Sequence, residues 1–202
     1  PFDIKSKITS KAINNENFRL LINNTNVGLT GNLLKSLEQN RAEWIWLLSD
    51  DDDIDFKVLE DLLPTLNGDY YNFSSEMFSR KKEIFGQGLK CFIENLDSYS
   101  NCLYMSTNFF RTNVFLNSLD LGYFNAGTIA PQIAFLISGL NKDLKFCLSN
   151  KILIRDRINS VPSWSIVEQS LNFTSLLYSK PILQNDLTKP FFKKMTKNEI
   201  PP

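Results

Sequence analysis

Four consecutive aspartates at residues 50–53 directly follow a short apolar run at residues 44–48, which contains Trp44 and Trp46. Carboxylates packed this closely repel one another unless a cation offsets their charge. Mg²⁺ and Mn²⁺ prefer such oxygen ligands and can bridge them to the phosphates of a substrate. The alternative is a solvated acidic turn before the next helix. Because the apolar run is typical of a buried strand, we favour the metal-binding interpretation.

The segments on either side of the acidic run predict the elements that would position it. Residues 44–48 indicate a strand, and residues 56–66 indicate the helix that follows. Residues 18–22 and 70–73 predict further strands, and residues 30–37 carry a helical apolar pattern. This alternation predicts a parallel sheet covered by helices. Open α/β sheets bind ligands beyond the carboxyl ends of their strands, where the aspartates would lie.

The second half of the chain is less regular. The clearest feature is a helix after Pro131, because proline suits a first helical turn and an apolar set follows it. Weaker patterns predict a helix at 89–96, strands at 103–106, 144–148 and 152–154, and a last amphipathic helix at 163–178.

Composition is that of an ordinary globular protein. The chain has 202 residues, of which 43% are hydrophobic and 22% charged, enough for one sizeable core. Its net charge is zero, so nothing in the bulk charge favours a nucleic-acid partner. The absence of histidine excludes histidine-based triads and histidine-ligated metals. The odd cysteine count predicts reduced core thiols in a cytosolic protein; the cysteines are Cys91, Cys102 and Cys147.

The order of these motifs resembles the core of family-two glycosyltransferases, which have the GT-A fold. The resemblance rests on the turn Asn26-Val27-Gly28, a helix, and the strand that ends in the acidic run as a D-x-D motif. It is most similar to bacterial enzymes that add sugars to O-antigen or capsular repeats, including the abequosyltransferase-like branch. Its specific part covers residues 18–55.

The resemblance implies one α/β domain over residues 1–202, with a Rossmann-like, mostly parallel sheet flanked by helices. Residues 1–75 would bind the nucleotide sugar, 76–180 would form the acceptor side, and 181–202 would form a C-terminal tail. Such domains normally begin with a strand, a helix and a second strand. We expect this chain to lack those three elements.

The resemblance further implies a nucleotide-sugar donor, a glycan or lipid-linked oligosaccharide acceptor, and transfer with inversion in the synthesis of a bacterial surface polysaccharide. Mg²⁺ or Mn²⁺ would offset the charge of the departing diphosphate. Asp52 and Asp50 are the expected metal ligands, although a shift of register would give one of these roles to Asp51. The expected donor-binding residues are Asn26, Gly28, Asn32, Asp50 and Asp51. Gly28 could instead serve only a turn that needs positive φ, and Asn32 could be an exposed helix residue.

An inverting enzyme needs a base that removes the proton of the acceptor hydroxyl. Many relatives carry a Glu-Asp pair at the start of the late helix, where this chain has Pro131 and Gln132. An amide is no base, so the nearest candidates are Asp120 and Glu76. Either could instead be a surface carboxylate.

Cationic side chains offer two further hypotheses. Arg111, Arg155 and Arg157 could hold a phosphate, because guanidinium binds phosphate through paired hydrogen bonds. The tail, residues 189–202, mixes lysines with Phe191 and Phe192 and predicts a loosely docked end. Such an end could touch a membrane surface, which would place a cytoplasmic enzyme at the inner face of the membrane.

Two other functions stay open. Phosphatases of the haloacid dehalogenase type also use Asp-x-Asp at a strand end, but a clean Thr or Val after the second aspartate is absent here. A non-catalytic nucleotide- or glycan-binding module would explain the missing base and the missing first elements.

Overall fold

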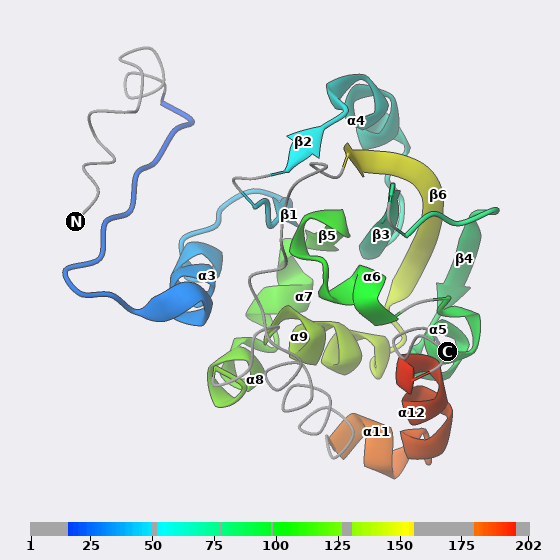
Figure 1. The fold of residues 1–202 in the computed structure, drawn as a ribbon. Helices are drawn as coiled ribbons and strands as arrows, with labels where there is room; N and C mark the ends of the chain where they lie inside the picture. Colours follow the sequence, from blue (N-terminus) through cyan, green and yellow to red (C-terminus); the bar gives the residue numbers. More distant parts are fainter. Residues whose placement is uncertain are drawn as a thin grey trace.

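The computed structural model describes residues 16–49, 52–76, 78–97, 99–126, 131–155 and 180–196. Within these ranges the chain forms an α/β fold, in which a mixed sheet is flanked by helices (Figure 1). Asp50, Asp51, Arg157 and the predicted helix at 163–178 lie outside them.

The sheet joins six strands in the part of the chain that is described. Its order is β1-β5-β3-β6-β2, and β4 also pairs with β6. Only β3 and β6 run parallel, so the prediction of a mostly parallel sheet is wrong. The strands are β1 (Trp44–Trp46), β2 (Asp53–Ile54), β3 (Tyr70–Ser75), β4 (Ile84–Gln87), β5 (Asn108–Arg111) and β6 (Lys145–Arg155).

The last strand is longer than its sequence pattern predicts. The two short strands expected at 144–148 and 152–154 are parts of β6. Residues 150–152 are exposed and separate two buried stretches of the strand. The register with β3 shifts there. A β-bulge of this kind bends a strand without ending it. β6 therefore pairs with β4 near its start and with β2 at its end.

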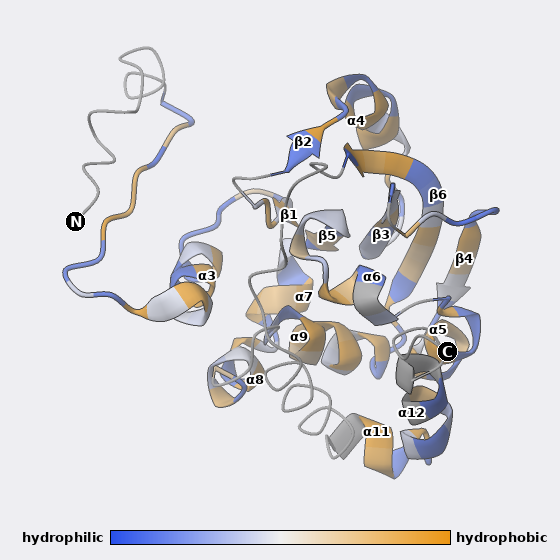
Figure 2. Cartoon of the chain, viewed as in Figure 1, coloured by the Kyte–Doolittle hydropathy of each residue, from blue (hydrophilic) through white to orange (hydrophobic). Residues whose placement is uncertain are grey.

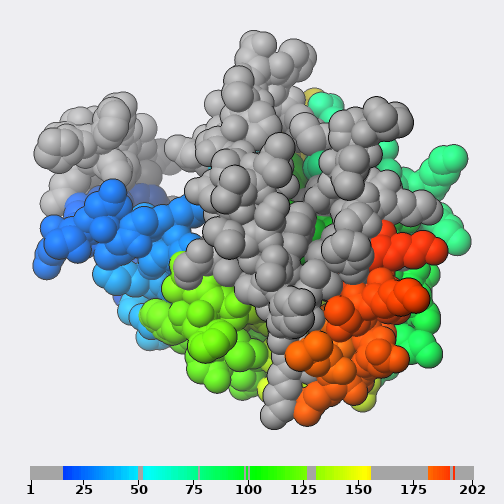
Figure 3. Space-filling view, turned by 60° about the horizontal axis from the view of Figure 1, so that its bottom comes forward, coloured from blue at the N-terminus to red at the C-terminus, as the bar shows by residue number. Residues whose placement is uncertain are grey.

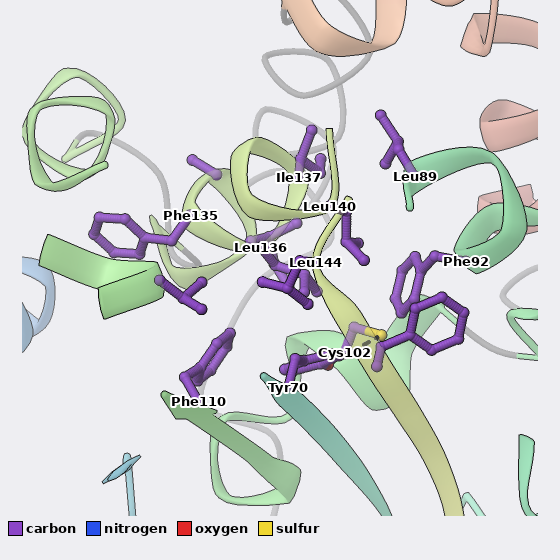
Figure 4. Packing of buried hydrophobic residues seen from close by; sticks show 14 of the residues in the cluster. Tyr70, Leu89, Phe92, Cys102, Phe110, Phe135, Leu136, Ile137, Leu140 and Leu144 are labelled. Atoms are coloured by element: carbon purple, nitrogen blue, oxygen red, sulfur yellow. Dashed lines mark hydrogen bonds between the residues drawn. The ribbon is translucent and has the colours of Figure 1, made fainter. Parts of the chain in front are cut away.

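The larger core lies between the sheet and the helices α3, α5, α7 and α9. Tyr70, Phe110 and Phe146 face this side, and Figure 4 shows Tyr70 and Phe110 below the α9 side chains Phe135 and Leu136. Almost every residue of α9 is buried, in agreement with its mostly apolar sequence, which Figure 2 shows in orange. The helices are α3 (Gly28–Glu38), α4 (Phe56–Leu62), α5 (Leu89–Asn95), α6 (Tyr99–Leu103), α7 (Thr112–Leu116), α8 (Leu119–Phe124), α9 (Pro131–Leu140), α11 (Lys180–Gln184) and α12 (Thr188–Thr196).

A smaller core lies on the opposite face of the sheet, where α4 packs. Tyr71, Phe73 and Phe109 point to this side because side chains alternate along a strand. Trp46 packs against Phe109, with ring centroids 4.8 Å apart. The helices at 89–96 and after Pro131 are confirmed by α5 and α9. None of the helices described is long and apolar enough to cross a bilayer.

The segment at residues 18–22, which was predicted to be a strand, is wrongly assigned. It pairs with no strand among the described residues, and Ile22 has 60% of its surface exposed. Figures 1 and 3 show this blue segment at the side of the molecule, away from α11 and α12. An apolar run alone does not make a strand; a neighbouring strand must complete its hydrogen bonds.

The tail is docked more firmly than its sequence predicts. The buried residues are Ile182 of α11, Leu187 of the turn that follows it, and Phe191 of α12. The Phe191 ring meets Tyr99 edge to face, with centroids 5.4 Å apart. The prediction of a loosely docked end is therefore wrong for residues 189–196, the described part of that tail.

Buried polar side chains connect β3, β5 and β6 within the larger core. Asn72 is fully buried; its Nδ2 donates to Asn108 Oδ1 (3.0 Å), and its Oδ1 accepts from Asn101 Nδ2 (2.7 Å). The buried guanidinium of Arg80 donates to the Asn72 side chain and to the Asn72 carbonyl (2.9 Å). Each buried group thus depends on the others, since an unpaired polar group in a core is costly. We call this set, with Ser149, the asparagine network.

We expect Asn72→Ala to lower the free energy of unfolding by about 3 kcal/mol, because it leaves the Arg80 guanidinium and two amides with missing partners. Urea unfolding followed by circular dichroism would measure this. Asn113→Ala, on the exposed side of α7, is the matched control and should change the value by less than about 0.5 kcal/mol. Equal effects of the two substitutions would contradict the role of the network.

Candidate active site at the end of β1

The chain leaving β1 is fastened to the turn that precedes β5. Trp46 Nε1 donates to the Ser106 carbonyl at 2.8 Å, and the Ser49 amide donates to Ser106 Oγ at 2.9 Å. Ser106 is fully buried in a short 3₁₀ turn, Met105–Thr107. These bonds fix the path of the backbone that leads into the acidic run. The sequence predicted a strand at 103–106, which is wrong, because this segment is the end of α6 and the 3₁₀ turn.

Of the two described members of the acidic run, Asp52 and Asp53, Asp52 faces inward. Its Oδ1 accepts a short hydrogen bond from the Tyr104 hydroxyl. Its Oδ2 is buried and has no hydrogen-bond partner. A carboxylate oxygen that is withdrawn from water and left unpaired is unfavourable. This atom is therefore suited to bind a cation or a hydrogen-bond donor of a ligand.

The two following aspartates have structural partners. Asp53 is exposed and opens β2, where it lies opposite Arg155. Asp55 caps α4 by accepting from the Val58 amide at 3.2 Å and forms a 2.7 Å ion pair with Arg155. The Val58 amide and then the Arg155 guanidinium lower the pKa of Asp55 below its usual value. Arg155 is thereby engaged with Asp55, which weakens the hypothesis that it holds a phosphate.

The other phosphate-binding candidate within the described ranges, Arg111, is also engaged. It forms an ion pair with Glu43, donates to the Gly68 carbonyl at 2.8 Å, and lies over the Trp44 ring at 4.8 Å. These contacts tie β5 to the start of β1. Arg111 therefore has a structural role in this fold.

The glycine turn forms beside α3 as the sequence predicts. Gly28 has φ of +70°, and its amide donates to Asn26 Oδ1 at 3.0 Å. Asn32 Oδ1 accepts from Asn23 Nδ2, and Lys35 Nζ donates to Asn23 Oδ1 at 2.7 Å. Asn26, Asn32 and Lys35 line an open cavity of about 380 Å³. Gly28 does not line it, which agrees with a turn-forming role.

The two candidate bases lie on different elements, and both are exposed. Glu76 directly follows β3. Its neighbour Ser75 lies opposite Ile154, which in turn lies opposite Ile54 of β2. Glu76 is thus at the same edge of the sheet as the acidic run, about two interstrand spacings from β2. Asp120 lies in the first turn of α8, which packs against α3 and α9.

Gln132 lies in the first turn of α9 and is 98% buried. Its Nε2 donates to the Leu103 carbonyl at 3.3 Å, and its Oε1 has no hydrogen-bond partner. Leu103 precedes the Tyr104 that binds Asp52. The segment 103–106 therefore connects the start of α9, the acidic run and the end of β1.

Sequence reasoning missed Tyr104 and Ser106. The available signal was the polar triplet Ser106-Thr107-Asn108 directly before the apolar start of β5. Buried polar residues need specific partners, so such a triplet beside a core strand indicates a hydrogen-bonded site.

A metal centre within the described ranges would rest on Asp52. No group of three or more candidate ligands occurs there, and Asp50 and Asp51 lie outside those ranges. The unpaired, buried Oδ2 of Asp52 is nevertheless a suitable hard oxygen ligand for Mg²⁺ or Mn²⁺. The chemistry of this donor fits the metal that the sequence predicts.

Comparison with known proteins yields a likeness among solved structures. No family model matches the chain, and no curated protein does. Among solved structures, residues 1–349 of TarS from S. aureus align with a TM-score of 0.63 and 14% identity. The alignment covers 98% of this chain and 60% of that structure. The chain therefore shares the fold of TarS, a staphylococcal glycosyltransferase. It spans 60% of the length of that TarS structure.

We expect Asp52→Asn to raise the free energy of unfolding by about 1 kcal/mol in EDTA, because it removes an incompletely paired buried charge. Asp53→Asn makes the same change in net charge at an exposed position and should alter stability by less than about 0.5 kcal/mol. Thermal and urea unfolding would measure both. A loss of stability in Asp52→Asn would show that this carboxylate is well satisfied without a cation.

The lowered pKa of Asp55 gives a pH-dependent contribution to stability. Because its folded pKa lies below its unfolded value near 3.8, the stabilisation is complete above that value and is lost as pH falls through the folded pKa. Asp55→Asn should keep the helix cap but lose the charge-dependent part. We expect the difference in unfolding free energy between wild type and variant to shrink from pH 6 to pH 3. A difference that is unchanged over this range would contradict this assignment.

Proposed function

We propose that this chain acts as a glycosyltransferase in the synthesis of a cell-surface polysaccharide. The observation that carries the proposal is the Asp52 carboxylate, which has one unpaired, buried oxygen at the end of β1 in a fold shared with TarS. The donor would be a nucleotide sugar, and the acceptor a glycan or a lipid-linked oligosaccharide. We further propose that it is similar to the abequosyltransferase-like enzymes. It would then act in the cytoplasm or at the inner face of the membrane.

In this proposal Asp52, with Asp50, holds Mg²⁺ or Mn²⁺. When bound, such an ion offsets negative charge on the departing diphosphate. Asn26, Asn32 and Lys35 supply hydrogen bonds to the nucleotide from the cavity beside α3. Residues 1–75 would thus serve the donor, and residues 76–180 the acceptor.

For inversion, the acceptor oxygen must bond to the anomeric carbon from the face opposite the departing diphosphate, and its proton must pass to a base. Glu76 is favoured over Asp120 because it shares the sheet edge with the acidic run. Gln132 can accept a hydrogen bond from the acceptor hydroxyl, but its amide cannot retain the proton. The base assignment stays a prediction.

One observation favours a second candidate function, a binding module that holds a nucleotide or glycan without turnover. Gln132 occupies the start of α9, where the family resemblance implies a Glu-Asp pair. It is buried, and its amide oxygen has no hydrogen-bond partner. Hydrolysis or transfer of a donor sugar would exclude this alternative.

Calorimetry of the full chain with UDP, GDP, CDP and dTDP, each in Mn²⁺ and in EDTA, tests the proposal. We expect one nucleotide to bind in Mn²⁺, and its affinity to fall at least tenfold in EDTA and in Asp52→Asn, because a metal ligand is lost. The Asp53→Asn variant should bind like wild type. Affinity that neither EDTA nor Asp52→Asn lowers from the wild-type value in Mn²⁺ would contradict the metal role.

Donor turnover is measured separately, by release of the nucleoside diphosphate from a panel of nucleotide sugars. Hydrolysis of p-nitrophenyl phosphate in place of that release would favour a phosphatase and contradict a glycosyltransferase.

A further inference from the structure

The backbone of Tyr104 is held at its carbonyl oxygen by the turn that follows it. This oxygen accepts from the Thr107 amide at 3.2 Å and from Asn108 Nδ2 at 2.7 Å. Thr107 Oγ1 lies 2.8 Å from the same oxygen and 2.7 Å from the Asn101 carbonyl oxygen, and its single hydrogen serves one of the two. A carbonyl with this many partners cannot shift without breaking several bonds at once. The backbone of Tyr104 is therefore fixed by this turn, and its partly buried ring packs against the smaller core.

One of these donors, Asn108, belongs to the asparagine network. It is fully buried, and its Oδ1 accepts from the Tyr70 hydroxyl at 2.6 Å and from Asn72 Nδ2 at 3.0 Å. Its amide also donates to the Cys102 carbonyl at 3.1 Å. Tyr104 is thus anchored through Asn108 to the core side of β3.

The anchored tyrosine offers its hydroxyl to only one oxygen of Asp52. The χ2 torsion of an aspartate is broad, so an isolated carboxylate can present either oxygen in many orientations. A fixed donor at Oδ1 selects one orientation. The same geometry leaves Oδ2 buried and unpaired.

We propose that Tyr104 is a positioning residue, whose hydroxyl holds Oδ1 of Asp52 so that Oδ2 stays directed at a divalent cation. The inference rests on the proposed function, because it takes Asp52 as a metal ligand. Outer partners of metal ligands typically contribute a factor of 10 to 100 in metal affinity. Tyr104 fills that role for Asp52.

The test is Tyr104→Phe, which removes the hydroxyl and keeps both the ring and the backbone carbonyl. We expect the dissociation constant for Mn²⁺ alone, measured by calorimetry on the full chain, to rise about tenfold. The melting temperature in EDTA should change little, because the hydrogen bond between Tyr104 and Asp52 is only partly buried. A selective loss of metal affinity distinguishes positioning from a merely structural role.

Tyr71→Phe is the matched control. Its hydroxyl accepts from the Asn67 amide at 2.8 Å and the Gly68 amide at 3.2 Å, in the turn that precedes β3 and not at Asp52. This variant should lower the melting temperature more than Tyr104→Phe does, and it should leave the Mn²⁺ affinity unchanged.

Asp52→Asn separates the two hypotheses. If it abolishes Mn²⁺ binding while Tyr104→Phe binds like wild type, the positioning role is overturned and the proposed metal role of Asp52 stands. If wild type and Asp52→Asn bind Mn²⁺ equally, or if neither binds it, the metal role in the proposed function is overturned, and the role of Tyr104 with it.

Discussion

A charged side chain enclosed by the core imposes the strictest constraint on this fold. The Arg80 guanidinium is 98% buried, and burial of a charge is tolerated only when hydrogen bonds and a counter-charge surround it. Its Nη1 donates to the carbonyls of Asn72 (2.9 Å) and Ser149 (3.4 Å), which belong to β3 and β6. Its Nε lies 3.5 Å from a carboxylate oxygen of Asp97. These partners can be met only if the two strands keep one alignment.

The same network reaches the candidate site. Asn72 donates a hydrogen bond to Asn108, and Asn108 donates one to the Tyr104 carbonyl. The Tyr104 hydroxyl in turn donates to Asp52. Ser106 fixes the end of β1 from the same turn. The placement of Asp52 thus depends on buried side chains of β3, β5 and the turn between α6 and β5. Sites whose supporting residues are locked by packing keep their geometry more closely than sites on free loops.

The sequence predicts local structure here better than it predicts pairing. Pro131 and the apolar set after it predict α9 because a helix satisfies its own backbone. The strand around Ile45 is predicted, but its antiparallel partner lies 65 residues later, at Phe110. Residues 18–22 have the composition of a strand and still lack a partner in the described ranges. Strand direction depends on such distant contacts, which no local pattern encodes.

For the candidate site, too, the sequence predicts local motifs but not the contacts between distant residues. The acidic run and the glycine turn stand out by residue type, so the sequence predicts Asp52, Asn26 and Asn32 as candidates. Tyr104 gave no signal, because a single tyrosine in an apolar stretch is usually a core residue. Its role follows from one hydrogen bond and from the carbonyl that Asn108 holds.

The parallel pair of β3 and β6 has a consequence for how the protein is made. Ser74 Oγ donates to the Ser149 carbonyl across 75 positions of sequence. At typical rates of translation, roughly 4 to 15 s separate the synthesis of these two residues. Throughout that interval Arg80 lacks its partner on β6 and must stay hydrated. The nascent chain therefore emerges with its central sheet incomplete, and it can close its interior only after the last strand has left the ribosome.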